Sequence, residues 1–318
     1  MISMRQHAIS IAAVFLALAI GIVLGSGLLS SGLISGIRDD RADLAEDLAA
    51  SDQQNNQLIE QLNAADGFDA AVSARIVRDS LAERSVLVVT TPDADPGDVD
   101  GVNRLLGEAG ASVTGQLSLT EPFVDATGGD RLRTIVNNVI PAGVTLRTGA
   151  VDQGSLAGDL LGAVLLMNSD TGQPQSTPAE MTLALDTLRS AGFIDYRDGS
   201  VAPAQSVVVV TGDGGAAAAE GATGNRGAVI ARFAGALDGR GAGAVLAGRP
   251  GSASGNGAVA VARADTAISQ ALTTIDNIDR AAGRITVALA LQEQLAGGAG
   301  RYGTGPGTTG VTVGASPG

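Results

Sequence analysis

Residues 85–90 read Ser85-Val86-Leu87-Val88-Val89-Thr90, and residues 206–211 repeat almost the same pattern as Ser206-Val207-Val208-Val209-Val210-Thr211. Each run is continuously aliphatic and has the length of a strand, which is typical of a parallel strand buried on both faces. Parallel strands need crossover connections that are usually helical, so the two runs predict an α/β fold.

The residues after each run repeat as well. A helical pattern over 99–106 and an alternating strand pattern over 113–119 follow the first run, and a helical pattern over 229–237 and a strand pattern over 244–246 follow the second. Each helical pattern is closed by a glycine, which is a common helix terminator. Two strand–helix–strand units predict an α/β body with two lobes.

Further helices are predicted between and after these units, over 132–139, 156–167, 179–191 and 285–295, because apolar residues recur there at helical spacing. The last residues are rich in glycine and predict a disordered tail. The expected organisation is a membrane anchor at 1–33, a coiled-coil stalk at 34–66, a first lobe at 67–200, a second lobe at 201–297 and a disordered tail at 298–318.

Composition excludes several classes of function. The 318 residues carry a formal net charge of −13, which argues against nucleic acid as a partner because a phosphate-binding surface needs clustered positive charge. There is no cysteine, no lysine and a single histidine, His7, so disulfides, Cys/His zinc sites, thiolate catalysis and histidine triads are excluded from the body. A serine nucleophile would lack an evident general base, so we expect a protein that is not an enzyme.

Residues 8–29 contain no charged side chain over 22 positions, which at the rise of an α-helix is about 33 Å and enough to cross a bilayer. We favour a retained transmembrane helix over a cleaved signal peptide, since the apolar run is long. Arg5 precedes the run, whereas all 33 acidic residues follow it, which favours an N-terminus inside the cell and the bulk of the chain outside. The expected location is the cell envelope as a single-pass membrane protein, and the helix favours the inner membrane.

Small residues recur every fourth position in this helix, at Ala13, Ala17, Gly21 and Gly25. Such a stripe lets two helices approach closely, which predicts helix–helix packing through Ala17, Gly21 and Gly25. The alternative is that glycine and alanine are simply common in membrane helices.

Residues 37–65 follow a heptad register, with alternating spacings of three and four. The positions that would form the seam of a short parallel coiled coil are Leu44, Leu48, Asn55, Leu58 and Leu62. The polar Asn55 would fix the register at some cost in stability. Together with the anchor, this stalk predicts a homo-oligomer, and the alternative is a solvated helix that pairs with nothing. Gly67 is expected to end the stalk helix.

Two groups of residues are candidate metal ligands. Asp93, Asp95, Asp98 and Asp100 follow the first strand, where open α/β sheets bind ligands, and carboxylates suit hard cations. Aspartate at a helix start is also an ordinary cap, which we favour. Met4 and His7, with the initiator methionine, offer soft donors of the kind that Cu(I) accepts, although a histidine beside a membrane is often only interfacial.

The segment 212–217, Gly-Asp-Gly-Gly-Ala-Ala, leaves the second strand and contains the G-x-G-x-x-A pattern of dinucleotide-binding loops. Asp213 would repel a phosphate, so a flexible connection is the favoured interpretation, and no cofactor is evident.

Several short blocks distributed along almost the whole chain are distinctive: 1–10 (MISMRQHAIS), 65–69 (ADGFD), 75–79 (RIVRD), 152–155 (DQGS), 246–249 (LAGR), 261–265 (VARAD) and 283–285 (GRI). Together they resemble the actinobacterial MctB family, the mycobacterial copper transport protein B group. The resemblance implies an envelope protein of copper homeostasis, with copper as the transported ion and a role as a copper efflux or pore-forming component, and it makes the outer membrane a possible location. No copper-ligand motif is carried over from it. The alternative function is a non-enzymatic envelope scaffold or assembly module, with an oligomeric stalk and a partner-binding α/β head.

Overall fold

The computed structural model describes residues 4–25, 30–214 and 224–315, with the backbone alone for residue 24 and residues 30–42. The chain divides into two compact units, Met1–Ala65 and Asp66–Gly318.

The first unit is helical. Helix α1 (Met4–Gly25) contains a 20-residue segment with a mean hydropathy of 2.1, which is long and apolar enough to cross a membrane, and its described side chains are exposed. Helix α2 (Ser30–Val77) begins in this unit and ends in the second. The prediction that Gly67 ends the stalk helix is wrong, because α2 continues for ten residues beyond it and buries Ser73 and Val77 in its last turns.

The second unit is built on a single seven-stranded sheet with the order β3-β2-β1-β4-β5-β6-β7. Its strands are β1 (Ser85–Thr90), β2 (Ser112–Leu119), β3 (Ile194–Tyr196), β4 (Ser206–Val210), β5 (Ala244–Ala247), β6 (Thr273–Ile275) and β7 (Arg301–Tyr302). All neighbouring pairs are parallel except β2 and β3. The α/β class predicted from the sequence is therefore confirmed.

The two strand–helix–strand units do not form separate lobes. Strand β1 pairs directly with β4, so that Val88 lies opposite Val208 in the middle of the sheet. Both valine-rich runs are central strands of one sheet, so each is hydrogen-bonded to a neighbour along both edges, and its two faces are covered by helices. The expected boundary at residue 200 is thus a connection within one body.

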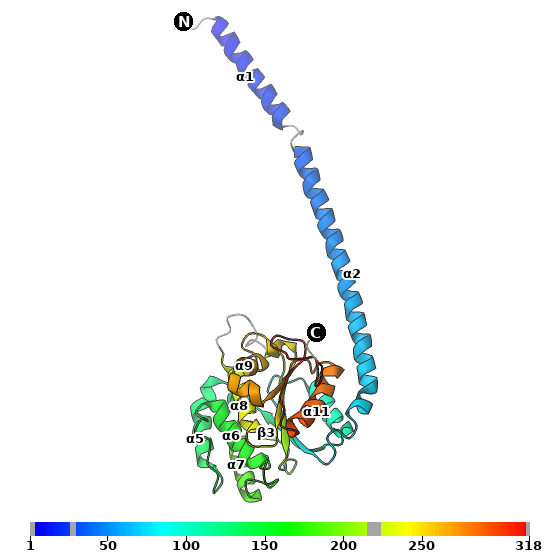
Figure 1. Ribbon diagram of the computed structural model, residues 1–318. Coiled ribbons are helices and arrows are strands. Elements are labelled where there is room, and N and C mark those ends of the chain that lie inside the picture. Colours follow the sequence, from blue (N-terminus) through cyan, green and yellow to red (C-terminus); the bar gives the residue numbers. More distant parts are fainter. Residues whose placement is uncertain (1–3, 26–29, 215–223, 316–318) are drawn as a thin grey trace. The chain divides into compact units, whose positions relative to one another are not determined.

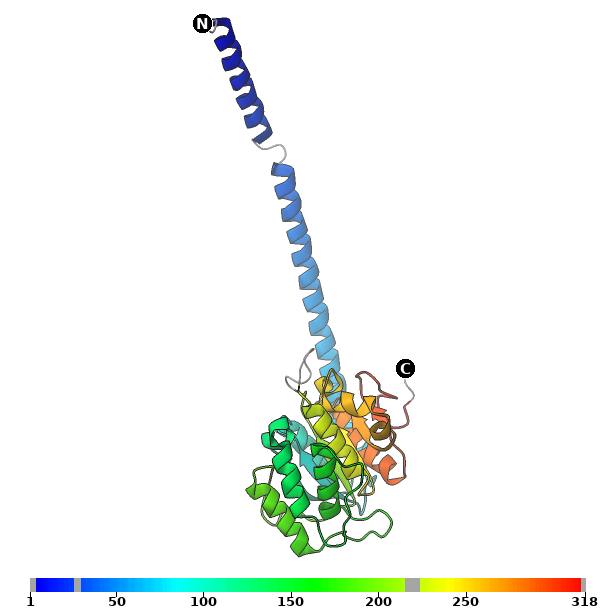
Figure 2. The same ribbon diagram turned by 90° about the vertical axis from the view of Figure 1, so that its left-hand side faces the viewer.

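Helices cover both faces of the sheet (Figure 1). They are α3 (Pro96–Glu108), α4 (Glu121–Val124), α5 (Gly129–Asn138), α6 (Gln153–Leu165), α7 (Pro178–Ser190), α8 (Arg226–Asp238), α9 (Ala258–Ala264), α10 (Thr266–Ala271) and α11 (Ala281–Leu295), with short 3₁₀ turns η1 (Ala126–Gly128) and η3 (Pro250–Ala253). Helices α5 to α9 form a thick layer on one face, seen from outside in Figure 2, and α3 and α11 cover the other face.

The alternation of side chains along the central strands separates two hydrophobic cores. Leu87 and Val89 of β1 join the core beneath α6 and α8, whereas Val86 and Val88 join the core beneath α3 and α11. Successive strand residues point to opposite faces, so one aliphatic run supplies both cores. Aromatic side chains contribute little, although Phe123 and Phe233 meet edge to face with ring centroids 5.3 Å apart.

The backbone of helix α6 packs closely against the backbone of helix α8. Gly154, Gly158 and Gly162 face α8, and an added Cβ at these positions would come within 2.2, 2.5 and 2.7 Å of the nearest atoms of α8 and the turn after it. Glycine at every fourth residue therefore gives α6 a groove that the backbone of α8 fills, and 12 of the 13 residues of α6 are buried.

The prediction of a disordered tail at 298–318 is wrong for the described residues 298–315. Strand β7 pairs with β6, and Tyr302 bridges to Gly310, so this segment closes one edge of the sheet. The Tyr302 hydroxyl donates to the Glu293 carboxylate at 2.7 Å. Glycine-rich composition does not prevent order here because specific contacts with the body compensate for the lost chain entropy.

Candidate functional site

The carboxyl ends of the parallel strands gather most of the charged side chains that the sequence singled out. Strand β1 has β2 on one side and β4 on the other, and the chain reverses its direction of winding at this point. In open α/β sheets ligands bind outside the strand ends at such a switch point. The acidic residues 93–100 follow β1 and therefore lie at this edge.

The four aspartates have different roles. Asp95 caps α3, and its side chain accepts hydrogen bonds from the backbone nitrogens of Gly97 and Asp98. Asp98 is buried with 3% exposure, Asp93 and Asp100 are exposed, and the cap interpretation is confirmed for Asp95. Among the described residues, no group of three or more His, Cys, Asp or Glu side chains is arranged to hold a metal ion.

Asp98 is held by two arginines from distant parts of the chain. Arg249, just after β5, donates to Asp98 through Nε at 2.6 Å, and Arg284 of α11 approaches it through Nη2 at 3.4 Å. Gly101 makes room for this arrangement, since a Cβ there would lie 2.8 Å from the Arg284 side chain. The hydrogen bond from Arg249 to Asp98 raises the pKa of the Arg249 guanidinium. A buried carboxylate that is fully paired is a structural feature and offers no free proton acceptor.

A second polar cluster lies directly at the switch point. The Thr91 hydroxyl, after β1, lies 3.1 Å from the Thr211 hydroxyl, after β4. Asp93 accepts a hydrogen bond from the Gly214 nitrogen at 3.1 Å. An acidic side chain that accepts from this backbone nitrogen would repel a phosphate there, which favours a simple connection over 212–217. Ala216 and Ala217 of that pattern lie outside the described residues.

The third cluster is a buried ion pair that the sequence did not single out. Arg263 of α9 donates to Asp276 after β6 through Nη1 at 2.6 Å, and the two side chains are 4% and 0% exposed. Arg263 also donates to the carbonyls of Tyr302 and Pro306, and Asp276 accepts from the nitrogens of Thr304 and Gly305. Burial lowers the pKa of Arg263, and Asp276 opposes that effect. This pair fixes the C-terminal segment onto the body.

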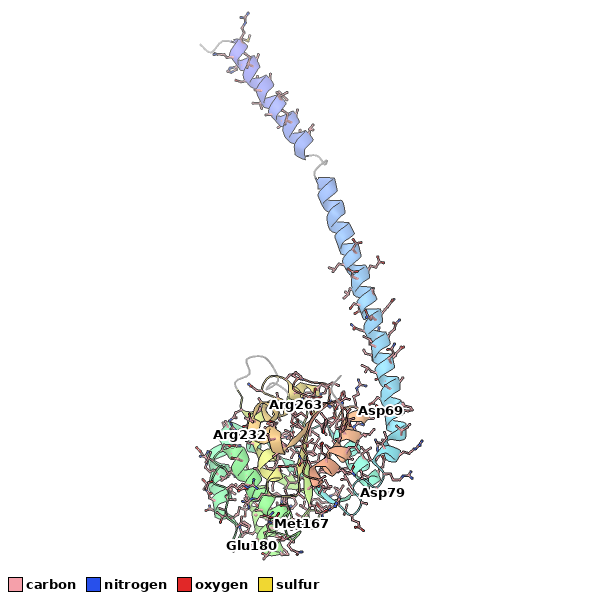
Figure 3. The ribbon with its side chains drawn as sticks, in the orientation of Figure 1. Asp69, Asp79, Met167, Glu180, Arg232 and Arg263 are labelled. Carbon is pink, nitrogen blue, oxygen red and sulfur yellow. The ribbon has the colours of Figure 1, made fainter. Side chains whose placement is uncertain are left out.

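The soft donors of the chain do not come together in the described structure. Met4 and His7 are exposed on α1, and Met4 has 91% exposure. Met167 lies at the opposite end of the body from Arg263 (Figure 3), and Met181 is half-buried on α7. Thioether and imidazole groups suit Cu(I), so Met4 and His7, one helical turn apart, are the pair with the appropriate chemistry.

The positions of α1 and α2 that were predicted to pack against other helices are exposed to solvent in the described structure. Leu44, Leu48, Leu58 and Leu62 are between 48% and 69% exposed on α2. A Cβ at Gly21 or Gly25 would meet nothing within 4 Å.

Comparison with known proteins identifies the family. Residues 1–313 match the family described as "Copper transport outer membrane protein, MctB". Proteins named copper transporter MctB from Mycobacterium tuberculosis and Mycobacterium bovis are 48% identical over 316 residues, covering 98% of this chain and 99% of each relative. A protein of the same name from Mycobacterium leprae is 47% identical over 319 residues with the same coverage. The chain belongs to the MctB family.

In this member of the MctB family, the blocks that carried the resemblance supply the long-range contacts described above. The block at 246–249 provides Arg249, the block at 283–285 provides Arg284, and both reach Asp98. The block at 261–265 provides Arg263, and the block at 65–69 provides Asp66, which accepts from the Ala281 nitrogen at 2.6 Å. These blocks therefore have a demonstrable structural role in the MctB fold.

Sequence reasoning missed Arg249, Arg263 and Arg284 as functional or structural residues of this MctB chain. Their partners Asp98 and Asp276 lie 151, 13 and 186 residues away, so no local spacing links them. The available signal was that each arginine stands inside one of the blocks on which the resemblance in the sequence analysis rests.

Proposed function

We propose that this chain acts in copper transport as a membrane-anchored protein of the cell envelope, and that it contributes to copper efflux. The observation that carries the proposal is the match of residues 1–313 to a family described as a copper transport outer membrane protein. The matched residues include α1 and α2 as well as the body, so the apolar N-terminal helix is part of the similarity to this family.

The anchoring rests on α1. Its apolar span covers Met4–Val23, its described side chains find no cover within the chain, and the acidic residues all follow it. Exposed aliphatic side chains over such a length are stable in a lipid bilayer and costly in water. The charge asymmetry supports a topology with Arg5 inside and the α/β body outside.

The copper chemistry is assigned to the start of α1. Met4 and His7 combine a thioether with an imidazole on one turn, and both donors are exposed at the end of the apolar span. A transported ion needs weak and transient contacts, so a site with few ligands suits a cargo better than a closed cage. In the body, Asp93, Asp95 and Asp98 already accept hydrogen bonds from threonine, backbone nitrogen or arginine donors, and carboxylates are less suited to a soft ion.

A pore cannot be lined by one helix, because a single helix encloses no channel. We therefore propose that any conducting form is an oligomer, held by the seam Leu44, Leu48, Asn55, Leu58 and Leu62 of α2 and by the groove Ala17, Gly21 and Gly25 of α1. Since every copy enters the membrane in the same direction, the helices of such an oligomer run parallel.

The proposal is tested by the copper content of cells that lack the protein. Deletion is expected to raise cell-associated copper and to reduce growth on copper salts, and the full chain supplied in trans is expected to restore both. A deletion strain with normal copper content and normal growth would refute the role in copper transport. Replacing Met4 and His7 together with Leu and Gln then measures the contribution of the donor pair, and His7→Gln alone separates the part that is due to the imidazole.

The second candidate is a non-enzymatic scaffold whose stalk oligomerises and whose α/β head binds partners. It is favoured by one observation: Leu44, Leu48, Leu58 and Leu62 of α2 are exposed, whereas the buried carboxylate of Asp98 in the body is paired with two arginines. Sedimentation of the detergent-solubilised chain tests the oligomer, with Leu48→Gln plus Leu58→Gln as the disruptive variant and Gln53→Asp, on another face, as the control. A monomer for the wild type would exclude an oligomeric stalk.

Conductance separates the two candidates. If the purified chain forms a copper-permeable pore, planar bilayers are expected to show conductance steps that disappear with the Leu48 and Leu58 variant. If planar bilayers show no conductance although deletion raises the copper content of cells, the scaffold would be favoured, with a separate partner protein that conducts the ion.

A further inference from the structure

A cleft of about 390 Å³ opens on the helical layer of the body, away from the strand ends. Its walls come from α6, α8, α10 and the loop before α6, and they include Arg147, Asp152, Asp159, Arg232 and Ile268. Figure 3 marks Arg232 on this layer. Its volume lies within the range of small-molecule sites.

The carboxylates around the cleft already accept hydrogen bonds from other donors. Asp159 accepts from Arg240 through Nε at 2.6 Å and Nη2 at 2.7 Å, and from the Arg147 backbone nitrogen at 2.7 Å. Asp152 accepts from the backbone nitrogens of Gly154 and Ser155 and from the Ser155 hydroxyl. Asp265 likewise accepts from two backbone nitrogens at the start of α10.

The two guanidinium groups of the cleft are left with weak partners. Arg147 reaches Asp159 only at 3.6 Å, and Arg232 reaches Asp152 only at 3.9 Å. In the described part of the chain, no hydrogen bond is formed by either guanidinium, although seven other arginines of the body do donate from theirs. Both side chains are nearly half exposed, at 44% and 47%, so their donors are accessible to a ligand.

The positions of the two arginines define the shape of the site. Arg147 lies over Gly239 at the end of α8, where an added Cβ would collide with its guanidinium, and Arg232 lies seven residues earlier on the same helix. Seven residues of helix span about 10 Å. Ile268 and the neighbouring alanines supply an apolar wall. A planar guanidinium binds carboxylate and phosphate oxygens in pairs, which makes oxyanions the natural ligands.

We propose that this cleft binds a small organic anion that carries a carboxylate or phosphate group, with Arg147 and Arg232 as the residues that recognise it. Arg147, Arg232 and the nearby Arg240 balance the charges of Asp152, Asp159 and Asp265. Recognition therefore comes from unused hydrogen-bond donors and not from a net positive charge. Asp238 is a further acid that faces Arg147, and it is occupied by the Ala244 nitrogen. The proposal is independent of the role in copper transport.

Titration calorimetry of the full chain in detergent micelles tests it. Adipate and glycerol 3-phosphate are the two probes, and neutral adipamide is the uncharged analogue. Binding of either anion but not of adipamide is expected, with affinity lowered about tenfold or more by Arg147→Gln and by Arg232→Gln. Arg133→Gln on α5, a similarly exposed arginine outside the cleft, is expected to bind like the wild type.

The relative affinity of the two probes assigns the anion as carboxylate or phosphate, and either result supports the site. Absence of binding for both anions, or equal binding by wild type, Arg147→Gln and Arg232→Gln, would overturn it. Thermal unfolding without ligand shows whether each variant is folded, and Arg232→Gln is the safer of the two because its ion pair is the longer one.

Discussion

Helices α1 and α6 carry the same pattern of small residues at every fourth position, but only α6 has its partner in this chain. In α6, Gly154 and Gly158 contact the backbone of α8, and almost the whole helix is buried. In α1, a Cβ at Gly21 or Gly25 would meet nothing, and the described side chains are exposed. The same pattern thus indicates a close helix contact in one region and an unfilled groove in the other.

The difference shows which region depends on surroundings outside the chain. The body pairs its buried Arg263 with Asp276 and buries its aliphatic side chains in two cores. The described aliphatic side chains of α1, and Leu44, Leu48, Leu58 and Leu62 of α2, are exposed, and we propose a membrane and further copies as the partners that cover them. Changes inside the body should therefore affect folding, whereas changes in α1 should affect association.

The largest effect on folding is expected for Arg263→Ala. It leaves the buried carboxylate of Asp276 without its charged partner and releases the C-terminal segment, which should lower the free energy of unfolding by about 3 to 5 kcal/mol. Chemical denaturation of the full chain in micelles measures it. Arg133→Ala, which breaks an exposed ion pair with Asp130, is the control and should cost less than about 1 kcal/mol. If Arg263→Ala and Arg133→Ala lowered the free energy of unfolding equally, the buried ion pair would contribute no more than the exposed one.

Gly154→Ala is expected to lower the free energy of unfolding by about 1 to 3 kcal/mol, because the new Cβ would lie 2.2 Å from the Val229 carbonyl oxygen. Gly107→Ala, in an exposed helical position with nothing within 4 Å, is the matched control and should stabilise the body slightly. The same denaturation experiment compares them. If both variants gained stability, the close contact between α6 and α8 would be disproved.

Asp238→Asn is expected to change the pH dependence of stability. Burial raises the pKa of Asp238 from 3.8 to about 6, so the native state binds a proton more tightly than the unfolded state does. Stability from this group is fully present below pH 4 and is lost as the pH rises to about 6. Asparagine can still accept from the Ala244 nitrogen, so the variant should be more stable above pH 6, by up to about 3 kcal/mol. Parallel pH profiles for the two proteins would contradict this assignment.

Gly21→Leu should leave the unfolding of the body unchanged, because no atom of the described residues lies within 4 Å of a Cβ at that position. It should instead weaken association in micelles, since a large side chain fills the groove that a second α1 would use. Sedimentation measures the change, and Ile22→Leu, a change of shape at an adjacent position of the same helix, is the control. If Gly21→Leu associated as the wild type does, the groove of small residues on α1 would have no role in the oligomer contact.

The sequence predicted the central strands and most helices, because long aliphatic runs such as 85–90 and 206–211 have few alternatives. It did not predict β3, β6 and β7, which have only two or three residues each and are too short to show a period. It placed a helix end at Gly67 and disorder after residue 297, where tertiary contacts of Ser73, Val77 and Asp276 override local composition. Among the site residues, the cap at Asp95 was accessible from local spacing, whereas the arginine partners of Asp98 were not.

The central claim is that this protein acts in copper transport while anchored in a membrane through α1. The most direct test replaces residues 1–33 with a cleavable export signal in cells that lack the wild-type protein, and measures their copper content. We predict that the exported but unanchored chain leaves copper as high as in the deletion strain, while the intact chain restores the normal level. Full restoration by the unanchored chain would contradict the account.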